Sequence, residues 1–406
     1  MKNLFKSYYG SFQGLRKEIW LLAVITLINR AGTMVIPFLS LYLTKSRGFT
    51  LEEVGWILTF FGLGSVTGSW LGGRLTDLIG HYKTMAISLI VSSVLFVLLQ
   101  FPESFWPICL GIYLVMTVAD IFRPAVFVAI SAYSKPENRT RSVTLIRLAI
   151  NLGFSAGPAV GGLIIATSGY SGLFWIDGIT CLAAGLLLLR LLHPKRSAPE
   201  PEDIVVQAKS AMTDGIYMVF IVAMMIFGFI FIQYFSTMPL YYAEVHDLNE
   251  FEIGLLLGLN GLFIFLFEMP LIKFLENKNF SATAYVILGT LLTGISFLVI
   301  NLTGWVGILV VGMLLVTIGE MIGFPFSNSF ALNRSDGKKR GSYMALYSIA
   351  FSVSHIFGHN TGMQLIDNFG FKFTWYTMFA LAILTCVLLF VLKGLLKKES
   401  DGAPIH

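Results

Sequence analysis

Apolar runs of about twenty residues recur along the whole of this 406-residue chain, and they constrain its fold more than any other feature. A run of that length can span the hydrocarbon core of a bilayer as one helix. We identify twelve such segments, so the sequence predicts an all-α membrane protein with twelve transmembrane helices. Their predicted bounds are 18–44, 53–77, 83–101, 105–133, 140–168, 170–193, 213–243, 251–275, 280–301, 304–333, 341–366 and 371–396.

Composition excludes other broad classes of protein. The chain is 56% hydrophobic and 13% charged, whereas a soluble protein carries about twice that charged fraction. The alternating pattern of a membrane β-barrel is absent. The net charge of +5 reflects loop lysines and arginines and is not a nucleic-acid signal. We therefore expect the lipid bilayer and a small molecule as partners, and no nucleic acid.

The reactive residue types suggest no enzyme. Cys109, Cys181 and Cys386 all lie in apolar runs, which fits neither a disulfide framework nor a metal site. The sequence contains no nucleophile–base set and no nucleotide-binding loop. The first apolar run has full spanning length, so we expect no cleavable signal peptide.

Lysines and arginines are distributed asymmetrically between the loops. The odd-numbered loops hold only Lys45, Arg47 and Lys372. The N-terminus, the even-numbered loops and the tail hold most of the others, among them Lys2, Lys6, Lys135, Arg141, Lys209, Lys338, Lys339 and Lys397. This bias predicts that both termini and the even loops face the cytoplasm, and we expect the protein in the inner (plasma) membrane.

The longest polar interval runs from Pro194 to Ala211 and contains the acidic residues Glu200, Glu202 and Asp203. Its prolines and charges are typical of a linker. We predict an N-terminal six-helix bundle at 1–193, a cytoplasmic linker at 194–212 and a C-terminal six-helix bundle at 213–406.

The two predicted bundles share a weak internal repeat. Its matching strings are Pro37–Tyr42 with Pro239–Tyr242, Thr50–Gly55 with Asn249–Gly254, and Gly169-Tyr170 with Gly370-Phe371. The second pair predicts two helix starts with acidic residues in the first turn. Two repeats of six spans are an architecture of secondary transporters.

The fifth run carries the most specific motif. Gly153, Gly157 and Gly161 recur every four residues and fall near one helix face, where a second helix backbone can approach closely. Pro158 removes a backbone donor and is expected to bend the helix. Packing alone would explain this spacing. The full string, which ends at Gly162, also resembles the fifth-helix antiporter motif of the major facilitator superfamily, in its drug–proton antiporter branch.

The loop after the second run resembles the superfamily signature G-x-L-x-D-R-x-G-R-K. Its matching positions are Gly73, Leu75, Asp77, Gly80 and Lys83. Leu78 and His81 stand where the family has arginines. The resemblance implies a cytoplasmic latch between the bundles, in which Asp77 faces a helix N-terminus.

Ionisable residues inside spans are costly, so each is a functional candidate. They are Arg30, Asp120, Arg123, Arg147, Asp177, Glu268, Glu320, His355 and His359. Spans three, nine and twelve lack a deep charge. The resemblance implies that these spans face lipid, together with span six, where Asp177 is near the outer end.

Asp120 and Arg123 are three residues apart and can pair on one helix face. Such a pair is either a structural ion pair or a proton site balanced by Arg123, Arg147 or Arg30. The family's fourth-helix motif follows its arginine with glutamine and glycine, and both are missing after Arg123.

Glu268 and Glu320 are the leading proton-carrier candidates, since their spans contain no lysine or arginine to balance them. A carboxylate buried without a cation is easier to protonate. The alternative for Glu268 is an ion pair with Lys273. Glu320 also resembles the span-ten glutamate of proton-coupled peptide transporters. Of the span-one motif E-x-x-E-R of those transporters, this sequence keeps the arginine, as Arg30, and lacks both glutamates.

His355 and His359 are one helical turn apart and can share a proton or bind metal. No HExxH pattern surrounds them, so we predict cavity histidines without metal. The other cavity candidates are Tyr42, Gln233, Tyr234, Asn260, Asn328 and Tyr347. An aromatic, methionine-rich wall suits amphipathic or cationic organic molecules.

Together with the resemblance, these patterns predict a proton-coupled secondary transporter that exports amphipathic small molecules or drugs by alternating access. Protons are the coupling ion, no other cofactor is implied, and we expect a monomer. The alternative is a proton-coupled symporter for peptides, sugars or other nutrients with the same fold. A membrane sensor that has lost coupling is disfavoured by the deep carboxylates.

Overall fold

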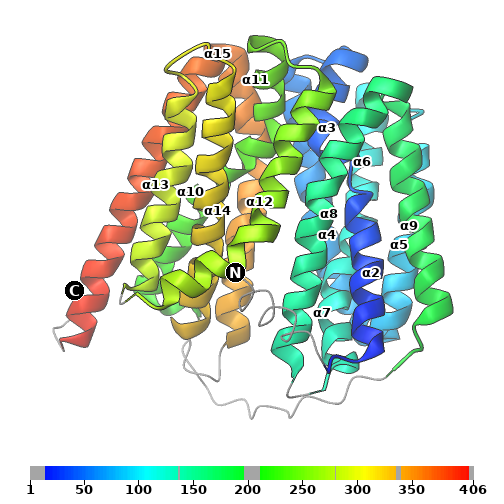
Figure 1. Ribbon diagram of the computed structural model, residues 1–406, viewed down its shortest axis with the longest axis horizontal. Coiled ribbons are helices and arrows are strands. Elements are labelled where there is room, and N and C mark those ends of the chain that lie inside the picture. Colours follow the sequence, from blue (N-terminus) through cyan, green and yellow to red (C-terminus); the bar gives the residue numbers. More distant parts are fainter. Residues whose placement is uncertain (1–13, 136–137, 196–210, 279, 335–339, 402–406) are drawn as a thin grey trace, which may run out of the picture. The chain divides into compact units, whose positions relative to one another are not determined.

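The computed structural model describes residues 14–135, 138–195, 211–278, 280–334 and 340–401 (Figure 1). Within these ranges the chain is all-helical. Eleven helical segments are long and apolar enough to span a membrane, and the last of them, Leu346–Ser400, contains the two final predicted spans. The prediction of twelve transmembrane helices is thus confirmed. In lipid the backbone must satisfy its hydrogen bonds internally, which is why these apolar runs form helices.

Six predicted spans make up the first half of the chain. Their helices are α2 (Lys17–Ala31) and α3 (Val35–Leu41) in span one, then α4 (Leu51–Ile79), α5 (His81–Leu98), α6 (Phe105–Asp120) with α7 (Phe122–Tyr133), α8 (Arg139–Ser168) and α9 (Ser171–Leu191). A short π-helical turn, Tyr42–Ser46, extends α3. Span one is therefore interrupted, whereas α8 continues through Pro158.

The second half contains six further spans. Its helices are α10 (Gly215–Ser236) with α11 (Met238–Val245), α12 (Glu250–Glu276), α13 (Ala282–Val299), α14 (Gly307–Arg334) and α15 (Arg340–Ser400). Span seven is interrupted between α10 and α11 at Thr237. Spans eleven and twelve form one helical segment with a break at Gly370 instead of the short loop that we expected.

The internal repeat is confirmed at two kinds of helix boundary. Gly169 (φ 71°, ψ −179°) and Gly370 (φ 77°, ψ 170°) share a left-handed conformation that other residues rarely adopt. At the starts of α4 and α12, Thr50 and Asn249 form capping boxes. The Glu53 amide donates to Thr50 Oγ1 over 3.2 Å, and the Glu252 amide donates to Asn249 Oδ1 over 3.0 Å.

The contacts between Cα atoms divide the chain into two compact units. Unit 1 comprises Met1–Tyr42, Phe60–Glu200 and Asn249–Phe265, and unit 2 comprises Leu43–Thr59, Pro201–Leu248 and Leu266–His406. Most of the predicted linker, 194–212, lies outside the described residues. The same holds for the basic residues Lys2, Lys6, Lys209, Lys338 and Lys339.

Each unit has its own apolar core, and the two cores differ in composition. In unit 1, α2 packs against α8 and α9 (Figure 1). The core there contains aliphatic side chains such as Leu22, Ile146 and Leu188. In unit 2, α10, α13, α14 and α15 meet around aromatic side chains, including Phe220 and Phe227. The core of unit 2 is thus the more aromatic of the two.

Candidate functional site

The break in span one is capped by a side chain from span six. Both carboxylate oxygens of Asp177 in α9 accept from the Met34 amide, over 3.0 and 3.2 Å, and one also accepts from the Val35 amide over 3.0 Å. The Asp177 side chain is fully buried. It satisfies amides at the start of α3 that have no partner within that helix. Sequence analysis placed Asp177 near the outer end of span six but missed this role, although Gly32 and Pro37 flank the break.

The glycines of the fifth-span motif face this break. A β-carbon at Gly153 would lie 2.5 Å from Arg30 Cβ and 2.9 Å from the Ala31 amide nitrogen. One at Gly157 would lie 3.3 Å from the Ala31 carbonyl oxygen, and one at Gly161 would lie 3.3 Å from Met34 Cβ. The motif therefore lets α8 approach the interrupted part of span one at backbone distance, as close small-residue packing in membranes requires.

A second face of α8 is equally tight. A β-carbon at Gly261 of α12 would lie 2.7 Å from Ser155 Cα, and one at Gly162 would lie 2.9 Å from Phe251 Cα. The Ser155 hydroxyl donates to the Gly258 carbonyl over 2.8 Å. These contacts all lie within unit 1. Sequence analysis missed Gly258 and Gly261, although their spacing from Gly254 is a helix-face signal.

The cations of unit 1 gather near one buried carboxylate. Asp120 is 5% exposed and accepts from the Ser65 hydroxyl. Arg30 is half-buried, and the charges of Asp120 and Arg123 both act on it. Its guanidinium lies 5.6 Å from the centroid of the Phe154 ring. The structure thus brings Arg30 into range of the predicted Asp120 site.

The predicted Asp120–Arg123 pair lies where α6 passes into α7. Ile121, the one residue between the two helices, has right-handed helical dihedrals (φ −56°, ψ −33°). Arg123 and Arg147 are both exposed in this structure. Within the described residues, the hydrogen-bond partner of Asp120 is Ser65 rather than Arg123.

In unit 2, the packing of α14 on α15 fixes an antiparallel register. The Phe324 and Phe351 ring centroids are 5.4 Å apart, and Ser327 Oγ and Tyr347 Oη are 2.7 Å apart. One helical turn further along the same faces, this register places Glu320 at the level of His355. Sequence reasoning had treated the two residues separately.

Two more groups complete this part of the site. The His355 and His359 ring centroids are 5.6 Å apart, and the charge of His355 acts on His359, which is 7% exposed. The charge of Glu320 acts on Tyr234 of α10. We call Glu320, His355, His359 and Tyr234 the carboxylate–histidine cluster.

An aromatic column continues from this cluster along α14 and α15. Phe324 stands 4.8 Å from Phe231 and 5.2 Å from Phe227, measured between ring centroids. Phe351 is 5.1 Å from Tyr347 in the same way. Phe231, Phe324 and Phe351 are only partly buried, so their rings form a surface as well as a packing layer.

The break in span seven is organised by Gln233, one of the predicted cavity residues. Its amide nitrogen donates to the Gly358 carbonyl over 2.8 Å, and its amide oxygen accepts from the Thr237 hydroxyl over 3.1 Å. The Gln233 side chain is fully buried. A β-carbon at Gly362 would lie 2.8 Å from Gln233 Cδ. Gln233 thus joins α10 to α15 and is not part of an exposed wall.

The remaining predicted cavity residues are divided between the two units. Tyr42 is buried in unit 1, with its ring centroid 5.0 Å from that of Phe174. Asn260 is 3% exposed in the part of α12 that belongs to unit 1. In unit 2, Asn328 is exposed, and the half-buried Glu268 precedes Pro270.

The predicted latch loop is a turn with one residue, Gly80, between α4 and α5. Its backbone has φ 83° and ψ 153°, which requires glycine. Asp77 and Lys83 are exposed, and a β-carbon at Gly73 would meet no atom within 4 Å. His81, which replaces a family arginine, is buried with its ring 5.5 Å from that of Tyr133.

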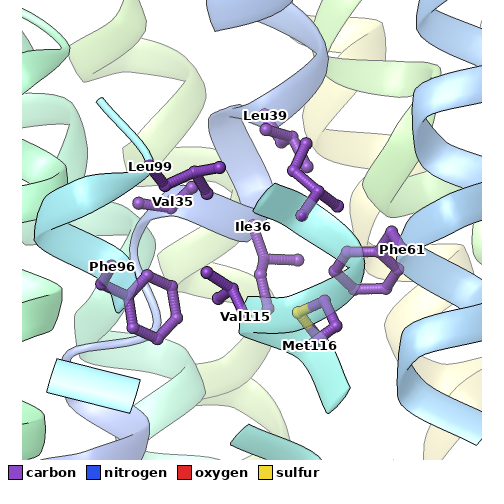
Figure 2. A pocket seen from close by; sticks show the side chains of 9 residues that line it. Val35, Ile36, Leu39, Phe61, Phe96, Leu99, Val115 and Met116 are labelled. Atoms are coloured by element: carbon purple, nitrogen blue, oxygen red, sulfur yellow. The ribbon is translucent and has the colours of Figure 1, made fainter. Parts of the chain in front are cut away.

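An apolar pocket lies beside α3 in unit 1. Figure 2 shows Ile36 and Leu39 of α3 together with Phe96, Val115 and Met116 around it. All nine of its lining residues are apolar, so it offers no hydrogen-bonding group to a polar ligand. Among the described residues there is also no group of three or more His, Cys, Asp or Glu side chains that could hold a metal ion.

A charge cluster joins three helix ends of unit 2. Arg334 Nε lies 2.9 Å from Asp214 Oδ2, and Arg334 Nη2 lies 2.9 Å from Glu399 Oε1. The Tyr343 hydroxyl donates to Asp214 Oδ2 over 3.0 Å. Burial alone would raise the pKa of Asp214, but the hydrogen bonds from Arg334, the Tyr217 amide and Tyr343 outweigh it and hold that pKa below its usual value.

Known proteins resemble this chain over most of its length. A protein from Bacillus subtilis, the uncharacterized MFS-type transporter YqjV, is 25% identical over 360 residues, which cover 86% of this chain and 87% of YqjV. The Na⁺, Li⁺, K⁺/H⁺ antiporter of Planococcus maritimus is 22% identical over 392 residues, 88% and 91% of the two chains. The quinolone resistance protein NorA of Staphylococcus aureus is 24% identical over 358 residues, 87% and 91%.

Solved structures share the fold at lower identity. A POT family transporter in complex with a thioalcohol-conjugated peptide superposes with a TM-score of 0.79 at 17% identity, over 94% of this chain and 97% of its own. The nucleoside transporter NupG superposes with a TM-score of 0.75 at 12% identity, over 93% and 100%.

The Major Facilitator Superfamily model matches residues 19–359 and 277–404. This is a family of transporters and not of enzymes. With the helices, breaks and deep charges described above, it follows that this chain belongs to the Major Facilitator Superfamily and is an integral membrane secondary transporter of a small molecule.

Proposed function

We propose that this transporter exports amphipathic organic molecules in exchange for protons. One observation carries the proposal: the contacts Phe324–Phe351 and Ser327–Tyr347 fix an antiparallel register of α14 and α15 in which Glu320 and His355 stand at the same level. A carboxylate and an imidazole at one level can hold zero, one or two protons between them, so the charge of the cluster changes with its protonation.

The aromatic column supplies the second half of the argument. Phe231, Phe324 and Phe351 present partly exposed rings within one to two helical turns of Glu320. Aromatic faces and an acidic group together suit a flat or cationic amphipathic molecule. Protonation of Glu320 removes the negative charge that such a molecule would contact, so proton and substrate compete for one site.

Competition of this kind yields exchange. A proton that binds the cluster releases the substrate, and a substrate that binds it displaces the proton. The name of the Planococcus relative, 22% identical to this chain, is that of a cation/H⁺ antiporter, and NorA, 24% identical, is named a quinolone resistance protein. The fifth-span glycines, at backbone distance from span one, fit the same antiporter assignment.

We also propose the orientation and the organisation of the chain. The loop distribution of lysine and arginine supports an inner-membrane protein with both termini in the cytoplasm. We retain the bounds 1–193, 194–212 and 213–406 for the two bundles and their linker, and a monomer as the working unit. Asp77 remains our candidate for the latch residue.

The test is a proton-flux assay in liposomes that contain a pH-sensitive dye and start without a gradient. Tetraphenylphosphonium, dialanine and glucose are added outside in separate experiments, as an amphipathic cation, a peptide and a sugar. We expect tetraphenylphosphonium entry to drive proton efflux. The Glu320→Gln variant is expected to lose this signal, because its amide cannot carry the proton.

Glu268→Gln and Glu276→Gln serve as comparisons in α12. Glu276 is an exposed carboxylate at the end of that helix, so its variant should retain the signal. Loss of the signal in Glu268→Gln alone would move the carrier to Glu268. Proton entry together with dialanine or glucose would establish symport instead, and no proton movement with any of the three probes would refute proton coupling to these substrate classes.

A further inference from the structure

The carboxylate of Asp177 is engaged entirely with the break in span one. It accepts three backbone hydrogen bonds of 3.0–3.2 Å from Met34 and Val35. These two amides belong to a segment 142–143 residues away in the sequence. The residue before α3, Met34, supplies no side-chain cap of its own. The start of α3 is therefore capped from another helix.

The segment between α2 and α3 is also confined on both sides. A β-carbon at Gly32 would collide with the Thr180 hydroxyl of α9. On the opposite side, β-carbons at Gly153 and Gly157 would come within 3.3 Å of Ala31 backbone atoms. α9 thus holds the break through a carboxylate and a close steric contact, while α8 closes the other side.

The position of the break determines where Arg30 lies. Arg30 is the only basic residue in the last turn of α2, two residues before Gly32. The Thr33 amide donates to the Arg30 carbonyl over 3.1 Å instead of continuing the α-helical pattern. If α2 ran on, the Met34 and Val35 amides would bond to carbonyls of the preceding turn and no longer to Asp177.

We propose that Asp177 is a positioning residue for transport: by ending α2 at Ala31, it holds Arg30 within range of Asp120 and Arg123. The Asp177 carboxylate acts through the backbone and touches no substrate in this scheme. Removal of its acceptor oxygens lets the helix re-form across Gly32–Met34 and turns Arg30 away from Asp120. The inference is independent of which substrate or coupling ion the transporter uses.

The experiment compares the wild-type protein with Asp177→Asn and Asp177→Ala in lipid nanodiscs. Hydrogen–deuterium exchange reports on the peptide that contains Met34 and Val35. Phenylglyoxal modification, followed by mass spectrometry, reports on the accessibility of Arg30, with the exposed Arg123 and Arg147 as references in the same sample. Neither readout needs a substrate, so failure here is distinguishable from failure of the proposed proton exchange.

Asp177→Ala is expected to change exchange at Met34–Val35 by at least about tenfold, since the Met34 amide, which also donates to the Gly32 carbonyl, and the Val35 amide exchange the Asp177 oxygens for carbonyls of the preceding turn. It should also change the ratio of Arg30 to Arg123 modification by at least about threefold, as expected of a group that moves. Asp177→Asn keeps the shape and one acceptor oxygen, so it should fold and give smaller changes of the same kind. Thr377→Ala is the control in span twelve, because the Thr377 hydroxyl donates to the Phe373 carbonyl of its own helix over 3.0 Å and caps no break.

If hydrogen–deuterium exchange at Met34–Val35 changed but the ratio of Arg30 to Arg123 modification did not, Asp177 would cap α3 without positioning Arg30. That result would overturn the proposal. Unchanged exchange in Asp177→Ala would overturn it as well. If Asp177→Ala does not fold, the result from Asp177→Asn decides on the same two criteria.

Discussion

The breaks in spans one and seven occupy equivalent places in the repeat but are held by different chemistry. Span one is capped by the carboxylate of Asp177, which reaches it from span six. Span seven is held by its own Gln233, which bonds to Gly358 in span eleven and to Thr237 at the break. A carboxyl group from another span supports the break in unit 1, whereas an amide from the same span supports the break in unit 2.

The two breaks also differ in the ionisable groups that lie near them. In unit 1, the positively charged Arg30 lies two residues before the break, near Asp120 and Arg123. In unit 2, the groups near the break are Glu320, through Tyr234, and the histidines. We infer that the architecture is shared and that the charges are specialised, with the fixed cations in unit 1 and the proton carrier in unit 2.

The largest expected effect separates the two carboxylates. Glu320→Gln should lower the initial rate of proton-coupled transport by about a hundredfold or more, because it removes a proton carrier. Asp120→Asn should lower it by only about tenfold, because in this comparison Asp120 orders Arg30 without carrying the proton. Rates are measured by dye-reported proton flux in liposomes. Equal losses in the two variants would break the proposed specialisation.

The next prediction compares the loss of stability when a close glycine contact is filled in each unit, at Gly153 and at Gly362. Gly153→Val should cost about 1–3 kcal/mol of stability through overpacking, because its β-carbon meets the Arg30 and Ala31 backbone region. Gly362→Val should cost about as much, because it meets the buried Gln233 amide, which can move away only by losing its bond to the Gly358 carbonyl. Thermal unfolding in detergent measures both. Gly73→Ala, whose β-carbon meets nothing within 4 Å, is the control and should leave the midpoint unchanged.

A smaller loss of stability is expected when the break in span seven is altered. Gln233→Leu removes the side-chain hydrogen bond to the Gly358 carbonyl, while the Thr237 hydroxyl keeps its bond to the Gln233 backbone carbonyl, so the expected cost is about 0.5–1.5 kcal/mol of stability. It removes no charge, so the phenylglyoxal reactivity of Arg30 should stay at the wild-type value. If Gln233→Leu altered Arg30 as strongly as Asp177→Ala does, the two breaks would not be independent.

The smallest expected effect is a pH dependence of stability that arises from Asp214, in the charge cluster with Arg334 and Glu399. Because the folded protein lowers the pKa of Asp214, this residue stabilises the fold above its unfolded pKa of about 3.9, and the contribution is lost as pH falls through the lower folded value. Asp214→Asn should therefore unfold at a lower temperature than the wild-type protein at pH 7. The gap should close when the pH is lowered from about 4 towards 3. A gap that persisted at low pH would show that the Asp214 charge is not its source.

Much of the fold followed from sequence, because a bilayer imposes one length and one type of secondary structure. The predicted bounds of α4, α8 and α14 agree with the structure within a few residues. The interruptions at Gly32–Met34 and Thr237 were missed, since hydropathy continues through them. Hydropathy measures transfer into lipid and does not register which backbone amides are bonded.

The candidate site was predicted only as separate residues. Glu320 and His355 were each selected because they are ionisable in an apolar span, but their common level depends on how α14 packs on α15. Gln233 was expected in a cavity and is instead fully buried. Asp177 shows the same limit, since its partners lie more than 140 residues away and are backbone amides, which every residue except proline supplies.

The glycine contacts of α8 also have a consequence for biogenesis. Unit 1 is not complete when its own six spans have been synthesised, because Asn249–Phe265 of α12 belongs to it. Ser155 must wait for Gly258, 103 residues later, which at typical rates of synthesis takes roughly 5–20 s. During that interval the narrow face of α8 at Ser155 and Gly162 is open to lipid or to an insertion chaperone. A ribosome stalled before residue 249 would therefore present an unfinished first unit, which makes α12 the segment whose arrival completes it.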